Sequence, residues 1–391
     1  MRLVAVLPVM VVFWLTAALA QAAGSGLVFG LLLVGPAGDK GYSQAQFEGG
    51  KYVEARLPGA RMLYLDKVNP ADRPGVTIPQ VVDDLVSKGA RLVFAGSEDM
   101  RDGILEAARQ HPDVAFVHVS GDDVLTGQAP PNVGNLFTRI EYAKMMAGFA
   151  AAMTSKTGRI GYLGPLVNAE TRRVANAAYL GARHAWVDVR GKKPDELVFK
   201  VTWIGFWFNI PGVTADPNQV AGAFFDQGAD VVISGLDTPE ALAVAAARRR
   251  AGADVHAIPY VYRPACAEAP SACLGVPYFN WGPPFLTVAR EVVQGTYRPR
   301  FDWLTPDFGA LNDPDKSPAG FLPGPALSAA AKAALDGYVA DLGAGRISPW
   351  AGPLAYQDGT PFVPAGRAAT DREIWFCPQL LAGMQGQSAS R

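Results

Sequence analysis

The chain has 391 residues, of which 49% are hydrophobic and 18% are charged, with 35 basic and 36 acidic side chains and a formal net charge of -1. This length and composition suit a globular protein with two cores rather than one. The balanced charge offers no basic surplus, which argues against a nucleic-acid partner or any partner recognised through bulk charge.

The N-terminus has the pattern of a secretory signal. Arg2 precedes an apolar run over residues 3–19, and small residues follow, so that cleavage after Ala20 and cleavage after Ala23 both fit. A membrane anchor is the alternative, because the run is almost long enough to span a bilayer. The small residues that follow the apolar run favour cleavage, and no cysteine near the cleavage site offers a position for lipid attachment. We therefore expect residues 1–23 to be removed from an exported protein.

The first half of the remaining chain alternates apolar runs with helical stretches. We predict strands at 27–34, 61–65, 91–96, 114–120 and 133–138, and helices at about 43–56, 78–89 and 102–110. The run at 27–34 is continuously apolar and is followed by Gly35 and Pro36, as expected of a buried parallel strand.

A second series follows. We predict helices at 141–158, 172–186, 217–229 and 239–253, and strands at 159–166, 197–207, 230–236 and 255–262. From about Asp302 the chain is rich in Pro and Gly, with one Ala-rich helix at 326–342. Strands separated by helices of this length predict parallel sheets, so the chain reads as two α/β lobes. Loops at the carboxyl ends of the strands would then converge on a ligand cleft between the lobes.

Enzyme motifs are missing from the sequence. There is no G-x-S-x-G, no H-E-x-x-H and no P-loop, and the glycine-containing turn at 35–41 lacks the G-x-G-x-x-G spacing. None of the four histidines lies at ligand spacing from a cysteine, so no metal site is expected. We therefore assign no catalytic residue and expect no cofactor. In an oxidising compartment, Cys266 and Cys273 are predicted to close a small disulfide loop, which leaves Cys377 over.

Several segments resemble one family. GPAGDKGYSQAQFEGG at 35–50 is similar to the opening motif of the basic-membrane-protein family of importer-associated binding proteins, which reads Gly, a short spacer, Asp-Lys-Ser-Phe-Asn and a downstream Glu-Gly. The most specific match is RIEYAKMMAGFAAAMTSKTGRIGYLGP at 139–165, and further similar blocks lie at 84–121, 224–252, 281–303 and 349–359. The order and spacing of these blocks carry the resemblance.

The resemblance implies an α/β fold of the type I periplasmic-binding-protein class: two Rossmann-like lobes that close about a hinge over a ligand in the interlobe cleft. The implied lobes are residues 24–138 plus about 264–300, and residues 139–263 plus about 301–391. It implies a periplasmic monomer of an ABC importer that delivers a purine base or nucleoside to permease subunits in the inner membrane. The alternatives are a non-purine heterocycle or a sugar as ligand, an exported nucleoside-processing hydrolase, and a receptor lobe that presents its ligand to a membrane sensor.

Seven residues are candidates for the ligand site. Asp39 and Tyr42 match the family motif's Asp and Phe, and the remainder are aromatic or acidic residues near predicted strand ends. The full set is Asp39, Tyr42, Glu98, Asp102, Trp207, Asp237 and Trp281. Aromatic faces would stack on a flat ring, and acids would accept hydrogen bonds from its N–H groups. A helix cap is the competing role for Asp39, Asp102 and Asp237, and packing is the competing role for Trp281.

The polar anchors that nucleoside binders of the family carry have no counterpart here. Where those proteins place an Asp and a Lys, this chain reads PYVYRP from residue 259 and YFN from residue 278. A bare purine base, or another flat heterocycle, is therefore as plausible a ligand as a nucleoside.

Overall fold

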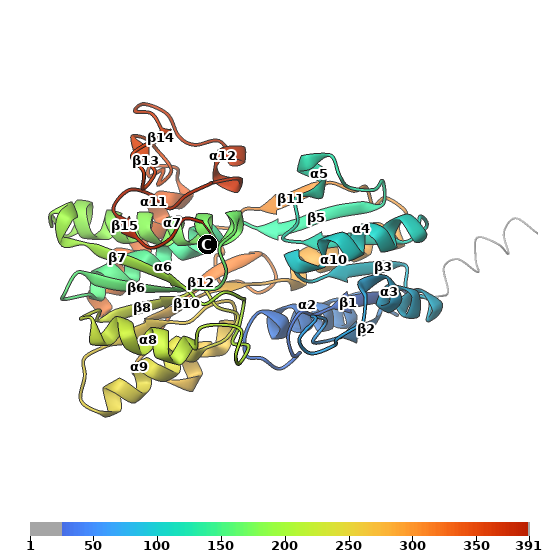
Figure 1. Cartoon of the computed structure of the whole chain (residues 1–391). Coiled ribbons are helices and arrows are strands. Elements are labelled where there is room, and N and C mark those ends of the chain that lie inside the picture. Colours follow the sequence, from blue (N-terminus) through green and yellow to red (C-terminus); the bar gives the residue numbers. More distant parts are fainter. Residues whose placement is uncertain (1–25, 390–391) are drawn as a thin grey trace, which may run out of the picture.

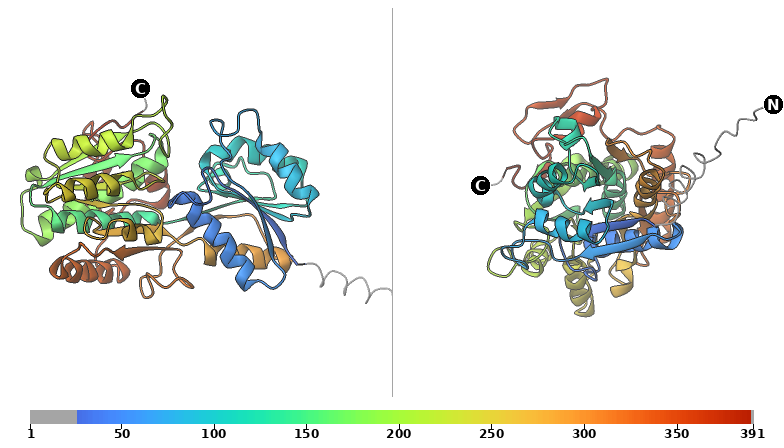
Figure 2. Two further views of the ribbon diagram at one scale, coloured as in Figure 1. Left: turned by 90° about the horizontal axis from the view of Figure 1, so that it is seen from below. Right: turned by 90° about the vertical axis from the view of Figure 1, so that its right-hand side faces the viewer.

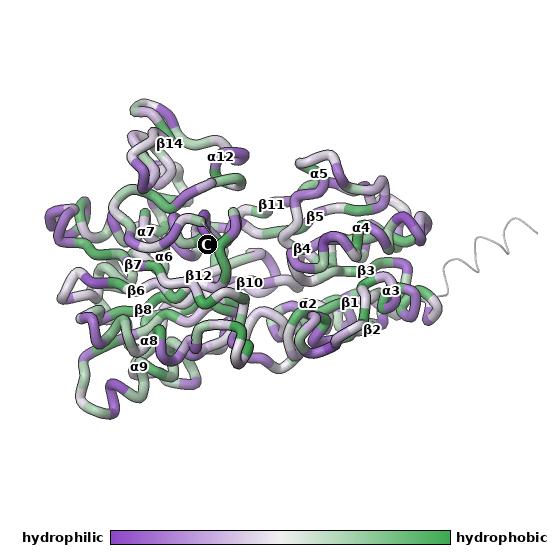
Figure 3. Tube along the Cα trace, in the orientation of Figure 1, coloured by the Kyte–Doolittle hydropathy of each residue, from purple (hydrophilic) through white to green (hydrophobic). Residues whose placement is uncertain are grey.

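The computed structural model describes residues 26–389, and the predicted signal at 1–23 lies outside this range. Two α/β lobes stand side by side and are joined by several segments (Figures 1 and 2). Hydrophobic residues gather along the strands of both lobes (Figure 3). Within the described range, no helix has the length and apolar character needed to cross a membrane.

The first lobe is built on a six-stranded parallel sheet of order β11-β5-β4-β3-β1-β2. Its strands are β1 (Val28–Leu32), β2 (Arg61–Leu65), β3 (Leu92–Ala95), β4 (Ala115–Val119), β5 (Val133–Thr138) and β11 (Phe301–Leu304), and its helices are α2 (Tyr42–Arg56), α3 (Ile78–Ser87), α4 (Arg101–Gln110), α5 (Asp123–Thr126) and α10 (Gly282–Val293). The apolar runs of the sequence form these strands, and β3 and β5 are buried along their whole length. The short 3-10 helix η1 (Glu98–Met100) leads from β3 into α4.

The second lobe is built on a five-stranded parallel sheet of order β15-β7-β6-β8-β9. Its strands are β6 (Arg159–Gly164), β7 (Val198–Trp203), β8 (Val231–Ser234), β9 (His256–Ile258) and β15 (Met384–Gln385). Its helices are α6 (Ile140–Thr154), α7 (Ala169–Arg183), α8 (Pro217–Asp226), α9 (Glu240–Arg250), α11 (Ala329–Gly343) and α12 (Asp371–Trp375), with short helical turns η2 (His184–Val189), η3 (Pro194–Glu196) and η4 (Arg263–Glu268). Two antiparallel pairs complete it: β10 (Gly275–Phe279) with β12 (Ala319–Pro323), and β13 (Leu354–Ala355) with β14 (Pro361–Val363).

Helices α6 and α7 pack closely because glycine lets their backbones approach. A Cβ atom at Gly148 would lie 1.8 Å from the Ala178 carbonyl oxygen, and one at Gly181 would lie 1.9 Å from the Met145 carbonyl oxygen. A side chain at either position would push the helices apart. This contact fixes α7, whose N-terminal end faces the first lobe (Figure 1).

Three crossings join the lobes, after β5, after β10 and after β11. Their positions differ from the expected boundaries at about 264 and 300. Cys266, Cys273 and Tyr278 pack in an apolar cluster of the second lobe, and β10 pairs with β12 of that lobe. Strand β11, beyond residue 300, instead pairs with β5 and completes the first sheet. The cause is pairing between strands far apart in the chain, which local sequence patterns do not reveal.

Two local predictions are also refined. The strand expected at 197–207 ends at Trp203, so that Trp207 lies in a loop. The helix expected from 172 begins at Ala169, because Asn168 and Thr171 form a capping box in which each side chain bonds to the other's backbone N–H.

Candidate functional site

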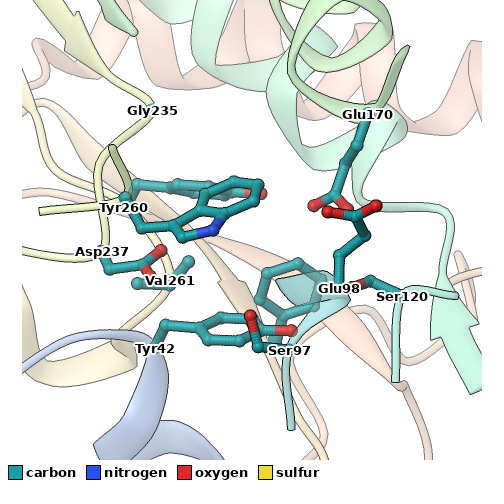
Figure 4. A pocket seen from close by; sticks show the side chains of 11 residues that line it. Tyr42, Ser97, Glu98, Ser120, Glu170, Gly235, Asp237, Tyr260 and Val261 are labelled. Carbon is teal, nitrogen blue, oxygen red and sulfur yellow. The ribbon is translucent and has the colours of Figure 1, made fainter. Parts of the chain in front are cut away.

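A cavity lies between the lobes, where loops that follow the parallel strands meet (Figure 4). Its wall combines aromatic, acidic and small residues: Tyr42, Ser97, Glu98, Ser120, Glu170, Trp207, Gly235, Asp237, Tyr260, Val261 and Phe279. This mixture of apolar aromatic surface with a few polar groups is typical of a pocket for a small organic ligand.

Four of the seven predicted residues line this cavity: Tyr42 and Glu98 from the first lobe, and Trp207 and Asp237 from the second. The lobes touch here, because the Tyr42 backbone N–H donates to the Asp237 carbonyl oxygen at 3.3 Å. The contact depends on Gly41, where a Cβ would lie 1.5 Å from that same oxygen. The N-terminus of α2 is thus seated directly on the Asp237 loop of the other lobe.

Asp39 does not line the cavity and instead holds the start of α2. Its carboxylate accepts hydrogen bonds from the backbone N–H groups of Gly41, Ser43 and Gln44 at 2.8, 3.0 and 3.0 Å. Burial raises the pKa of this carboxyl, although these hydrogen bonds act in the opposite direction. Asp39 therefore has the helix-capping role that was the alternative to ligand binding. It contributes to the site by holding the start of α2, which positions Tyr42.

Asp102 and Trp281 also lie outside the cavity wall. Asp102 is exposed in the first turn of α4. Trp281 is 1% exposed and packs behind the wall, stacked on Phe279 with ring centroids 4.9 Å apart and edge-on to Tyr42 at 6.0 Å. Trp281 therefore supports the aromatic wall from the first-lobe side.

The aromatic wall is held in place by polar contacts. The indole Nε1 of Trp207 donates to the Asp99 carboxylate of the opposite lobe at 2.6 Å, which fixes the ring across the cleft. The Tyr260 ring lies over the ammonium of the fully buried Lys144, with Nζ 3.4 Å from the ring centroid. Burial lowers the pKa of Lys144 well below its ordinary value.

Three carboxyl groups face the cavity: Glu98, Glu170 and Asp237. Burial is the main cause of a raised pKa in each of them, and it brings the pKa of Glu170 to about 8. Neighbouring acids add to the effect, among them Asp99 beside Glu98 and Asp39 beside Asp237. The cavity is thus acidic and favours hydrogen-bond donors over acceptors.

The sequence interpretation missed seven lining residues: Ser97, Ser120, Glu170, Gly235, Tyr260, Val261 and Phe279. Several of them lie directly after strands of the structure, so a position near a strand end was the available signal. Ser97 comes shortly after β3, Ser120 after β4, and Gly235 after β8. Glu170 is the first acidic residue of α7, where the capping box at Asn168 was the signal.

Comparison with known proteins agrees with this fold. Residues 27–189 match a family described as ABC transporter substrate-binding protein PnrA-like. The chain is 26% identical to a purine-binding protein of Brucella abortus over 361 residues, which cover 92% of this chain and 93% of that protein. It is 28% identical to a putative ABC transporter glucose-binding protein of Haloferax volcanii over 208 residues, or 53% of this chain and 48% of that protein.

Solved structures show the same architecture. An ABC solute-binding protein from Conexibacter woesei superposes with a TM-score of 0.60 at 19% identity, covering 82% of this chain and 98% of that one. A second, from Aeropyrum pernix, gives a TM-score of 0.61 at 15% identity, covering 82% and 92%. These likenesses confirm the type I periplasmic-binding-protein fold, and the relatives are binding proteins rather than enzymes. As the resemblance predicted, residues 27–189 are similar to the PnrA-like ABC transporter substrate-binding proteins, and almost the whole chain is similar to a purine-binding protein.

Proposed function

We propose that this protein is the periplasmic receptor of an ABC importer and that it captures a purine in the interlobe cavity. The observation that carries the proposal is the pairing of aromatic faces with unpaired carboxyls in one cavity between two lobes. Tyr42, Trp207, Tyr260 and Phe279 offer flat apolar surfaces to a heteroaromatic ring, and stacking contributes roughly 1 kcal/mol per face. The carboxyls accept hydrogen bonds from the N–H groups at the ring edges.

The lobes would close over the bound ligand, and the permease would recognise this closed conformation. Because Tyr42 and Trp207 come from different lobes, a ring held between them joins the lobes. The purine-binding relative supports a purine, since its similarity spans almost the whole chain. A bare purine base and a purine nucleoside are the two candidates. An adjoining hollow, lined by Asp122 and Asn168 among others, has room for a further polar group.

A sugar is the main competitor, since sugar sites also combine aromatic faces with carboxylates and one relative is named as glucose-binding. Thermal stabilisation of the purified protein distinguishes these ligands. The panel consists of purine bases, purine nucleosides, pyrimidines and glucose. A ligand at 100 times its Kd stabilises the folded protein by about 2.7 kcal/mol. We expect a purine to raise Tm and glucose to have no effect.

The site is tested with two tryptophan variants. Trp207→Ala removes a wall residue and should abolish the purine-induced shift. Trp203→Ala is the matched control, because Trp203 lies four residues earlier on β7 and donates from Nε1 to the Gln387 carbonyl oxygen, away from the cavity. A shift with glucose and none with any purine would leave the fold unchanged and overturn the ligand.

A further inference from the structure

A second cavity, here called the hinge cavity, lies beside the crossing after β10. Phe279 lines both this cavity and the ligand cavity, and Trp281, which stacks on Phe279, lines only the hinge cavity. The two cavities are therefore separated by one aromatic wall. The volume of the hinge cavity is about 200 Å³. An engineered cavity of about 150 Å³ in the core of another protein binds a benzene ring, so the hinge cavity has room for one small aromatic molecule.

The walls of the hinge cavity come from both lobes. Tyr52 of α2 packs against the core of the first lobe, whereas Tyr262 and Tyr278 belong to an apolar cluster of the second. The shape of the cavity therefore depends on the angle between the lobes. The lobes touch in this structure, through the hydrogen bond between Tyr42 and Asp237. A molecule that fits the cavity in this arrangement favours it over a more open one.

Hydrogen bonds to groups outside the cavity hold two of these walls in place. The Tyr52 hydroxyl donates to Oδ1 of Asp315 at 3.0 Å, and the Tyr278 hydroxyl donates to Oδ1 of Asn312 at 3.0 Å. Neither acceptor lines the cavity. Flat surfaces that are already fixed lose little conformational entropy when a ring packs against them. The hinge cavity is thus preorganised for an aromatic ring.

Arg263 gives the cavity a positive charge. Its half-buried guanidinium donates from Nη2 to the Asn312 carbonyl oxygen at 3.0 Å and lies 5.4 Å from the centroid of the Tyr278 ring. Among residues 26–389 it has no carboxylate partner within ion-pair distance. A guanidinium binds a carboxylate through two parallel hydrogen bonds, and Nε and Nη1 remain for such a pair.

Glu48 indicates how an anion would lie in the cavity. It is an exposed residue of α2, on the first-lobe side, and its carboxylate accepts a hydrogen bond from Nε2 of Gln44 at 3.1 Å. Its charge repels a second carboxylate. The carboxylate of an occupant therefore belongs at Arg263 on the second-lobe side, and its ring belongs toward Tyr52. The wall of the ligand cavity carries three carboxyls and no cationic side chain, so it is the less favourable place for an anion.

We propose that the hinge cavity is a second ligand site, which binds a small aromatic carboxylate on Arg263 and thereby favours the arrangement in which the lobes touch. This site is separate from the purine cavity and does not depend on the identity of the ligand there. A ligand held between Tyr42 and Trp207 also joins the lobes. Both molecules then favour the same arrangement, and each should raise the affinity for the other.

Calorimetric titration of the purified protein with benzoate tests the site. Benzamide has nearly the same shape without the charge and is the matched probe. We expect benzoate to bind with a Kd of about 1 mM or lower. Benzamide should bind at least about 10-fold more weakly, because it cannot form the charged pair with Arg263. Equal affinity for the two compounds would overturn the proposed role of Arg263.

Two variants locate the bound benzoate. Arg263→Gln should weaken benzoate binding at least about 10-fold while the protein melts like the unmodified one. Arg250→Gln, at an exposed position on α9, is the matched control and should bind benzoate like the unmodified protein. Unchanged benzoate affinity in Arg263→Gln would show that benzoate does not bind in the hinge cavity, and the proposal would fail.

The coupling is measured by titrating the compound with the largest thermal shift in the panel of purines, pyrimidines and glucose, with and without saturating benzoate. We expect benzoate to lower the Kd of that compound about 5-fold or more, and Arg263→Gln to remove the effect. An unchanged Kd would contradict the link to lobe closure. Displacement of benzoate by the compound would place both in one cavity and overturn the second site. If no compound of the panel binds, the purine proposal fails, and the benzoate titration alone decides the hinge site.

Discussion

Replacing Glu170 by glutamine should stabilise the ligand-free protein at alkaline pH and leave its stability unchanged at acidic pH. Burial raises the pKa of Glu170 from 4.5 to about 8, and the acids Glu98, Glu141 and Asp99 add to the rise while Arg173 opposes it. The charged form of this carboxyl is therefore disfavoured in the folded protein. Glutamine has nearly the same shape and carries no charge at any pH.

The sign follows from the direction of the shift. A group whose pKa is higher in the folded state than in the unfolded state stabilises the fold fully below its unfolded pKa and loses that contribution as pH rises through its folded pKa. For Glu170 the loss falls between pH 4.5 and about pH 8. The variant does not undergo this loss, so the two proteins should diverge progressively across the same window.

The magnitude is limited by the size of the shift. Each unit of pKa corresponds to about 1.4 kcal/mol, which sets an upper limit of about 5 kcal/mol. Water that enters the open side of the cavity will reduce this figure, and we expect about 2 kcal/mol at pH 8.5. That corresponds to a rise in Tm of roughly 4 °C for a protein of this size.

Differential scanning calorimetry from pH 4.5 to pH 8.5, without ligand, measures the difference. Glu106→Gln, at an exposed position on α4, serves as the control and should show the same pH profile as the unmodified protein. A Glu170→Gln variant whose Tm differs from the unmodified protein by the same amount at every pH would show that Glu170 is not held in the unfavourable environment described here.

Three further predictions follow from the packing and from the site. Asp102→Asn should leave purine affinity and Tm unchanged within error in calorimetry, because the side chain is exposed and outside the cavity; a 10-fold loss of affinity would place it in the site after all. Arg173→Met should destabilise the fold by roughly 3 kcal/mol in urea unfolding, because it leaves Glu141 buried without its ion-pair partner at 2.7 Å; an unchanged unfolding midpoint would contradict this. Reduction of the Cys266–Cys273 disulfide should cost about 2 kcal/mol, as expected for closure of a short loop, and should lower Tm in a scan with and without reductant; equal Tm values would show that the bridge does not constrain the unfolded chain.

The lobes could be predicted from the sequence because their strands carry strong local signals. Some elements can be predicted from a dozen residues or fewer. The apolar run at 27–34 is observed as β1, and the helix predicted at 78–89, which ends at a glycine, is observed as α3. The lobe boundaries could not be predicted in the same way. Strand β11 belongs to the first sheet only through its pairing with β5, more than 150 residues away in the chain.

The candidate site was predicted in part, and the misses have a common physical cause. Glu98 and Asp237 were found because parallel strands deliver their following residues to one edge of the sheet. Asp102 has the same local pattern, but the turn of α4 directs it to solvent. Trp281 follows β10 as Trp207 follows β7, yet it is buried behind the wall while Trp207 lines it. The direction of a side chain at a strand end depends on tertiary packing, which sequence patterns do not specify.

The site is distributed over both lobes, so ligand binding and closure of the lobes are coupled. Neither lobe alone presents a complete set of partners, since Tyr42 and Glu98 lie on one and Trp207, Glu170 and Asp237 on the other. Burial is the main cause of the raised pKa of Glu98 and Glu170, and the charge of Glu98 adds to the rise at Glu170. A ligand that contacts Tyr42 and Trp207 at once bridges the two lobes, so its binding stabilises the closed form. A molecule that contacts one lobe alone has no differential affinity for the closed form, and it would not shift the population of closed protein.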